Sequence, residues 1–178
     1  MIKYKLTTES ITRNGKKLFR IEAVISFGKI ESGEKGGFIE KEENLSHNND
    51  AWVSGDAEVY GDAEVSGNAR VSGNAEVYGN ARVSGNAEVY GDAEVSGNAE
   101  VSGNAWVSKK AITIDGGCQF HITICNTTIQ IGCHCHSIAE WDDIIQAKTY
   151  EKECASESEY EKCVRAYEFA KTLLKQEA

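Results

Sequence analysis

The sequence predicts a mainly β protein built around a parallel β-helix, and three observations lead to that prediction. Val recurs every six residues from Val53 to Val107. Each Val follows an Ala by two residues, so both side chains point to the same side of an extended strand. The chain contains 17 Gly and no Pro, and many of these Gly fall at a fixed position of the repeat. Such regular repetition is typical of a solenoid, in which each unit buries its apolar face against its neighbours.

Each six-residue unit is predicted to form a short strand followed by a corner. The residue between Ala and Val points outward, and Gly followed by Asn or Asp readily adopts the positive φ that turns a chain. A helix is excluded because its apolar positions would be three and four residues apart. A calcium-binding nonapeptide roll is excluded because its period is nine. Three strands with their corners close one coil, so residues 18 apart in this sequence are expected to stack.

This stacking places the outward side chains in three columns. The columns are Trp52, Arg70, Glu88 and Trp106; Glu58, Glu76 and Glu94, with Tyr60 and Tyr78 beside them; and Glu64, Arg82 and Glu100. Like charges on adjacent strands are destabilising. We therefore expect the all-Glu column either to be fully solvated or to receive Arg from another subunit.

Segments on both sides of the repeat are expected to cover its open ends. Residues 1–44 are predicted to form an N-terminal β cap, with a hairpin at Asn14-Gly15. The solenoid is assigned to residues 45–116, with Leu45 as its first core residue and a small loop at 47–50.

Residues 117–178 are predicted to form a small α+β domain. The stretch CQFHITICNTTIQIGCHCH is interpreted as a β-hairpin that turns at residues 126–128. Two helices follow, because Ser137 with Glu140 and Ser156 with Glu159 have the spacing of capping boxes.

The repeat V-[SY]-G-[ND]-A-x resembles the hexapeptide repeat of left-handed parallel β-helices. This resemblance implies the left hand, whereas the general rule for parallel crossovers gives the opposite hand. With the N-terminal segment and the segment GCHCHSIAEW, the chain resembles uncharacterised hexapeptide-repeat proteins encoded in phages and prophages. The resemblance implies a homotrimer, and a bare solvated face is the alternative. The candidate interface residues are Trp52, Arg70, Arg82, Glu58, Glu76, Tyr60 and Tyr78.

No catalytic residue is predicted. Hexapeptide acyltransferases, the nearest enzymes with this solenoid, use a His as base, but residues 51–108 contain no His. Only His47 lies beside the coils, and its simplest interpretation is a polar loop tip.

No metal or other cofactor is predicted either. In one continuous strand, Cys133 and Cys135 would face away from His134 and His136, so the four could not bind one ion. A thiolate site completed by Cys118 or Cys125 stays open, and the alternative is that the cysteines are small core residues.

A polar surface is predicted where the solenoid meets the C-terminal domain, with Thr123 and Gln130 on the same hairpin face as the imidazoles. Imidazole, ammonium and aromatic groups there favour a small anionic, nucleotide-like ligand, and an ordinary solvated face is the alternative. The candidate ligand-binding residues are His121, His134, His136, Lys109, Lys110 and Trp106.

The net charge and the hydropathy of the chain argue against two further kinds of partner, nucleic acid and the lipid bilayer. The net charge of -9 argues against a nucleic-acid partner. No apolar stretch approaches the roughly 20 residues that span a bilayer, and the start MIKYKLTTES lacks the apolar core of a signal peptide, so a cytoplasmic location in a bacterial host is expected. The sequence thus predicts a non-enzymatic, homotrimeric, phage-type protein that sequesters a small ligand or a host factor near the C-terminal domain. The alternatives are a structural virion or assembly trimerisation segment, and an acyltransferase with His47 as base.

Overall fold

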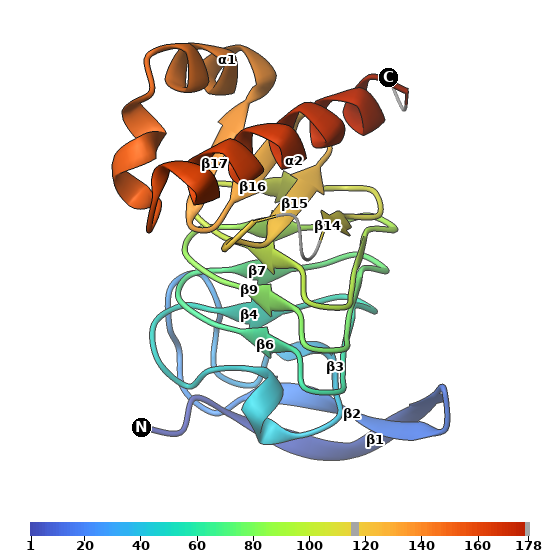
Figure 1. The fold of residues 1–178 in the computed structure, drawn as a ribbon. Helices are drawn as coiled ribbons and strands as arrows, with labels where there is room; N and C mark the ends of the chain where they lie inside the picture. Colours follow the sequence, from blue (N-terminus) through green and yellow to red (C-terminus); the bar gives the residue numbers. More distant parts are fainter. Residues whose placement is uncertain (115–117, 177–178) are drawn as a thin grey trace.

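The computed structural model describes residues 1–114 and 118–176. In Figure 1 a stack of short strands separates the N-terminal strands from two α-helices at the opposite end. The predicted boundary between residues 116 and 117 lies outside the described residues. The strands are β1 (Tyr4–Arg13), β2 (Lys16–Ala23), β3 (Lys35–Ile39), β4 (Trp52–Val53), β5 (Glu58–Val59), β6 (Glu64–Val65), β7 (Arg70–Val71), β8 (Glu76–Val77), β9 (Arg82–Val83), β10 (Glu88–Val89), β11 (Glu94–Val95), β12 (Glu100–Val101), β13 (Trp106–Val107), β14 (Ile112–Ile114), β15 (Ile122–Cys125), β16 (Thr128–Ile131) and β17 (His134–Ser137). The helices are the 3-10 helices η1 (Glu42–Asn44) and η2 (Thr149–Glu153) and the α-helices α1 (Ile138–Gln146) and α2 (Glu157–Gln176).

The short strands form a β-solenoid with three parallel sheets and about four turns. Their orders are β5-β8-β11, β4-β7-β10-β13 and β6-β9-β12. Trp52 pairs with Arg70, Glu58 with Glu76 and Glu64 with Arg82, so paired residues are 18 apart in the sequence. The three predicted columns are confirmed.

The interior of the solenoid consists of the Ala and Val of the repeat. Every one of them from Ala51 to Val107 is at most 2% exposed. Full burial of a Val side chain contributes about 1.5–3 kcal/mol, so these pairs account for much of the stability of the coils. Leu45 lies in this core, because it is buried and bridges Val65 in parallel register. The prediction that Leu45 is the first core residue is wrong, since Ile39 precedes it, is fully buried and pairs with Val59 in parallel register.

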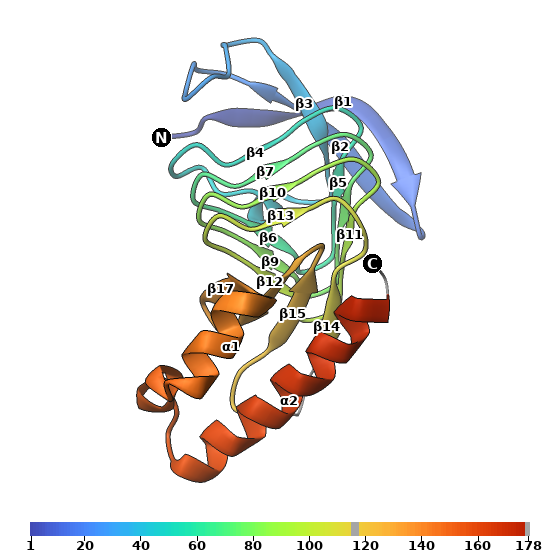
Figure 2. The same cartoon turned by 90° about the horizontal axis from the view of Figure 1, so that it is seen from above.

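The N-terminal strands continue one of the solenoid sheets. The predicted hairpin at Asn14-Gly15 is confirmed, since β1 and β2 pair antiparallel and both turn residues have positive φ. Strand β3 then pairs with β2 on one side and runs parallel to β5 on the other. The hairpin therefore lies beside the solenoid, as Figure 2 shows.

This hairpin supplies the positive charge that the all-Glu column requires. Arg13 donates from Nε and Nη2 to the Glu58 carboxylate at 2.6 and 2.7 Å, and its Nη2 lies 3.5 Å from Glu76. At the other end of the column, Lys110 donates to Glu94 at 3.0 Å. The expectation of either a solvated column or an Arg from another subunit is therefore wrong, because both cations belong to the same chain.

Three of the candidate interface residues are covered by their own chain. Trp52, Glu58 and Tyr60 are 2%, 5% and 4% exposed. Phe27 packs edge-on against Trp52 with ring centroids 5.4 Å apart, while Leu18 belongs to the cluster around Tyr60. The expectation that these three side chains face a partner subunit is wrong, since the N-terminal segment occupies that place. The other four, Arg70, Glu76, Tyr78 and Arg82, stay partly or fully exposed.

The C-terminal part is a four-stranded antiparallel sheet, β14-β15-β16-β17, followed by α1 and α2. The predicted turn after β15 is confirmed, but the second strand of the predicted hairpin is wrong. That stretch forms two strands, β16 and β17, because Gly132 turns the chain with a φ of +57°. Both predicted helix starts are confirmed: Ser137 Oγ accepts the Glu140 N–H, and Ser156 Oγ accepts the Glu159 N–H.

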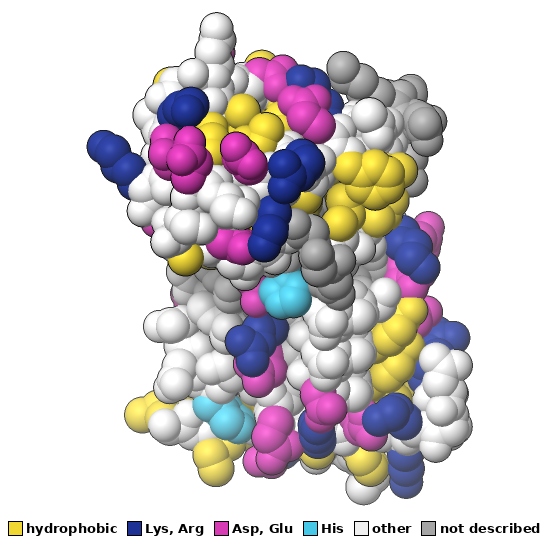
Figure 3. Space-filling model, viewed as in Figure 1, with side chains coloured by type: hydrophobic (Ala, Val, Ile, Leu, Met, Phe, Trp, Pro, Cys, Tyr) yellow, Lys and Arg dark blue, Asp and Glu magenta, His cyan; other side chains and the backbone are white. Residues whose placement is uncertain are grey.

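Charged side chains of both signs share the molecular face seen in Figure 3. Lys and Arg stand among Asp and Glu over the helices and over the N-terminal end. In the described part of the chain, no helix combines the length and the apolar character needed to cross a bilayer.

Two corner glycines, Gly85 and Gly97, provide a matched test of how closely the corners of successive coils stack. Gly85 and Gly97 both have positive φ, at +67° and +66°. A Cβ on Gly85 would lie 2.8 Å from the Gly103 backbone N, whereas one on Gly97 would meet no described heavy atom within 4 Å. We predict that Gly97→Ala lowers the free energy of unfolding by about 1–2 kcal/mol for the left-handed backbone. We predict that Gly85→Ala costs about 1–3 kcal/mol more for the clash. Urea denaturation measures both, and equal losses would contradict this stacking.

Candidate functional site

The C-terminal sheet turns one face toward the last coil of the solenoid. Thr123, Gln130 and Cys135 are in register across β15, β16 and β17, so they share that face. Cys125 is part of the apolar core of the solenoid, and Cys135 packs against it. The opposite face carries four Ile residues and packs on α1 and α2 around Trp141.

Side chains of this sheet replace the next coil as hydrogen-bond acceptors. Thr123 Oγ1 accepts the Glu100 N–H at 3.2 Å, and Gln130 Oε1 accepts the Ser102 N–H at 3.0 Å. The Gln130 amide also donates to Ser102 Oγ at 3.0 Å. These contacts terminate the β6-β9-β12 sheet with side chains, so no further coil is needed there.

Described residues terminate the neighbouring sheet, β4-β7-β10-β13, at one position. In the coil below, Asn86, Glu88 and Tyr90 donate to the carbonyls of Gly103, Ala105 and Val107 at 2.7, 2.9 and 2.9 Å. The corresponding donors of the last coil belong to Asn104, Trp106 and Ser108. Asn126 Oδ1 accepts the Ser108 N–H at 3.1 Å. Among the described residues, the N–H groups of Asn104 and Trp106 have no acceptor.

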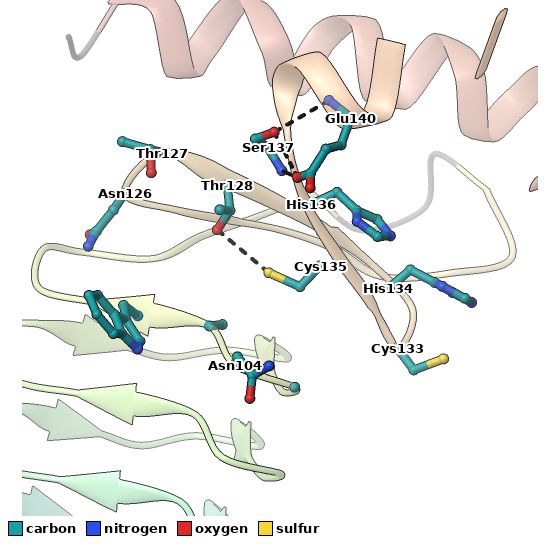
Figure 4. A pocket seen from close by; sticks show the side chains of 13 residues that line it. Asn104, Asn126, Thr127, Thr128, Cys133, His134, Cys135, His136, Ser137 and Glu140 are labelled. Atoms are coloured by element: carbon teal, nitrogen blue, oxygen red, sulfur yellow. Dashed lines mark hydrogen bonds between the residues drawn. The ribbon is translucent and has the colours of Figure 1, made fainter. Parts of the chain in front are cut away.

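A cavity of about 560 Å³ lies over these two donors. Its floor is the chain from Gly103 to Trp106, and its other walls come from residues 126–128, 133–137 and Glu140. Figure 4 shows Thr128 and Cys135 pointing from the sheet toward Asn104. Trp106 is 61% exposed, so its indole is accessible at the edge of the cavity.

The two imidazoles of the predicted site line this cavity but belong to the other face of the sheet. Figure 4 shows His134 and His136 projecting away from the side to which Cys135 points. The His134 ring packs edge-on against Tyr150 at 5.3 Å, and the His136 ring against Trp141 at 5.1 Å. The expectation that both His share a face with Thr123 and Gln130 is wrong, because the turn at Gly132 changes the register.

The predicted cations are dispersed. Lys110 pairs with Glu94, and neither Lys109 nor His121 is among the residues that line the cavity. Of the six candidate residues, the structure therefore brings together Trp106, His134 and His136. Among the described residues, Glu140 is the one whose carboxylate lines the cavity, and it accepts hydrogen bonds from the Ser137 backbone and hydroxyl.

The cysteines lie on different sides of the C-terminal sheet. Cys125 and Cys135 face the solenoid, Cys118 packs with the helices, and Cys133 is exposed. Burial raises the pKa of the Cys125 thiol to about 12, which disfavours the thiolate that binds metals. Within residues 1–114 and 118–176, no three His, Cys, Asp or Glu side chains are placed to share a metal ion.

His47, the candidate base of the acyltransferase alternative, is held by the N-terminal segment. Its Nδ1 accepts the Lys3 N–H at 3.3 Å, and its ring stacks on Tyr4 with centroids 4.3 Å apart. These contacts give His47 a packing role.

Sequence reasoning missed Asn104, Asn126 and the capping role of Gln130. Asn126 has a positive φ of 46°, which suits a turn, but its Oδ1 contact with Ser108 depends on long-range docking. The available signal was that the repeat ends at Val107, which implies that the last coil must find other acceptors.

Isosteric substitutions at Thr123 and Thr127 test whether side chains of the C-terminal sheet terminate the β6-β9-β12 sheet. Thr123→Val removes the acceptor of the Glu100 N–H at a site that is 1% exposed. We predict a loss of about 1–3 kcal/mol in the free energy of unfolding, the usual penalty for a buried donor left unpaired. Thr127→Val at the exposed turn should change it by less than about 0.5 kcal/mol. Chemical denaturation of both variants measures the difference, and a harmless Thr123→Val would exclude this role.

Comparison with known proteins supports a repeat β-helix. A family model described as the YdcK beta solenoid repeat matches residues 63–79 and 75–91. These two segments include strands β6 to β10. No curated protein matches the chain.

Proposed function

We propose that the protein is a non-enzymatic binding protein that sequesters a ligand in the cavity between the last coil and the C-terminal sheet. The observation that carries this proposal is the cavity itself, with its accessible indole and two open backbone donors. Its volume of about 560 Å³ falls within the range of known ligand sites, about 300–1,000 Å³.

We further propose that the protein assembles as a homotrimer, with a left-handed coil and an N-terminal hairpin cap. We also propose that it is encoded by a phage and acts in the cytoplasm of a bacterial host. The hexapeptide-like repeat supports the left hand and the trimer. Arg70 and Arg82, which keep exposed surface, are the interface residues that fit such an assembly.

A nucleotide-like host signal is the small-ligand form of this proposal. The Trp106 indole offers a face on which a base could stack, with a gain of about 1–3 kcal/mol. The dispersal of Lys109, Lys110 and His121 leaves backbone N–H groups, instead of ammonium groups, as the donors nearest to such a ligand.

Native mass spectrometry and tryptophan fluorescence test this function together. We predict that protein purified from its host has the mass of a trimer and retains a small molecule, and that nucleotide signals titrated into the stripped protein change the emission of Trp106. Trp52 and Trp141 are at most 2% exposed, so Trp106→Phe should remove that change. Absence of a retained molecule, together with no calorimetric binding, would exclude the small-ligand form. A purely monomeric mass would exclude the trimer.

A further inference from the structure

The two open donors have a spacing that selects among ligands. Asn104 lies at the corner that precedes β13, and Trp106 is the first residue of β13. In the coil below, the equivalent N–H groups of Asn86 and Glu88 donate to two separate carbonyls, so a ligand that replaces the next coil presents one acceptor to each donor. Carbonyl oxygens on one edge of an extended peptide recur at the same two-residue spacing, as Gly103 and Ala105 do above Asn86 and Glu88.

From this match we propose that the cavity binds an extended peptide segment of a partner protein, which adds as a parallel strand to the open edge of β13. This inference rests on the proposed binding function and names its ligand class. Two peptide carbonyls accept the Asn104 and Trp106 N–H groups, and the side chain of the residue after the second carbonyl stacks over the Trp106 indole, just as Trp106 follows Ala105 and pairs with Glu88. Strand addition of this kind obtains affinity from main-chain hydrogen bonds and specificity from alternate side chains.

The charge around the cavity favours a basic side chain at the position over Trp106. Glu140 lines the cavity, and residues 51–108 contain two Arg against six Glu and three Asp, a net charge of -7. In the same column, Arg70 already lies between Trp52 and Glu88. A guanidinium over an indole gains about 0.5–1 kcal/mol at an exposed site.

The repeat supplies a matched pair of probe peptides. Acetyl-GNARVS-amide copies residues 79–84, and acetyl-GNAEVS-amide copies residues 97–102. We predict that a dye-labelled GNARVS peptide binds the full chain about two- to fivefold more tightly than the GNAEVS peptide, as measured by fluorescence anisotropy. Equal affinities, or a preference for Glu, would overturn the assigned side-chain position.

Substitutions at Trp106 separate the backbone donor from the indole. Trp106→Ala should abolish the preference for Arg but keep strand addition. Trp106→Pro also removes the N–H, and Pro is tolerated on an edge strand, so binding should weaken about two- to tenfold beyond the Ala variant. Equal binding by the two variants would show that the edge is not used.

A mirror-image GNARVS peptide of D-amino acids is the second measurement, which does not depend on a variant that folds. It keeps composition and charge but cannot present its carbonyls in parallel register, so it should not bind. Binding equal to that of the L-peptide would overturn strand addition. If neither L-peptide binds but a nucleotide does, this inference fails while the proposed function stands; if neither class binds, both fail.

Discussion

The structure depends on the hydrogen bonds that each coil donates to the next. Every coil places its N–H groups under the carbonyls of the coil above, so the ladder continues only as long as another coil follows. The Ala and Val pairs fill the interior, and the corner Gly let adjacent backbones approach closely. A ladder of this kind leaves unpaired backbone N–H and C=O groups at both ends. The segments that cover those ends are therefore the parts of the molecule that differ most from the regular repeat.

The two ends are treated differently. At the N-terminal end, strand β3 continues one sheet, and the buried Lys3 ammonium donates to the carbonyls of Asn49 and Ala51. Burial lowers the pKa of Lys3 to about 8, so a charged group is held there at a cost in solvation. At the C-terminal end, Thr123, Asn126 and Gln130 act as acceptors, and one stretch of edge is left over. The cavity and the open edge thus arise from an incomplete termination of the ladder.

Much of the fold could be predicted because it depends on local spacing. The period of six residues fixes which side chains point inward, and three strands per coil give the columns at an interval of 18. The hairpin at Asn14-Gly15 and the capping box at Ser137 are equally local. The candidate site was predicted only in part, because Trp106 was placed correctly at the solenoid end but the His were given the wrong face. One Gly that was not interpreted as a turn, Gly132, reversed the faces on which the side chains of β17 lie.

The remaining features depend on contacts between distant segments. That Arg13 reaches Glu58 follows from where the hairpin lies, and neither residue indicates this in the sequence. Likewise, Gln130 lies beside Ser102 only after the C-terminal sheet has docked on the last coil. Such pairings require a three-dimensional arrangement, because residues far apart in sequence have no common period.

Amide hydrogen exchange of the unliganded protein, followed residue by residue by NMR, shows which edge donors of the last coil are capped and which are open. Two capped donors flank two open donors within a few residues of the same coil, so each pair is an internal control for the other. We predict that the amides of Ser102 and Ser108 exchange at least about a hundredfold more slowly than those of Asn104 and Trp106. Equal protection of all four amides would contradict it, because the ladder would then be closed along its whole edge.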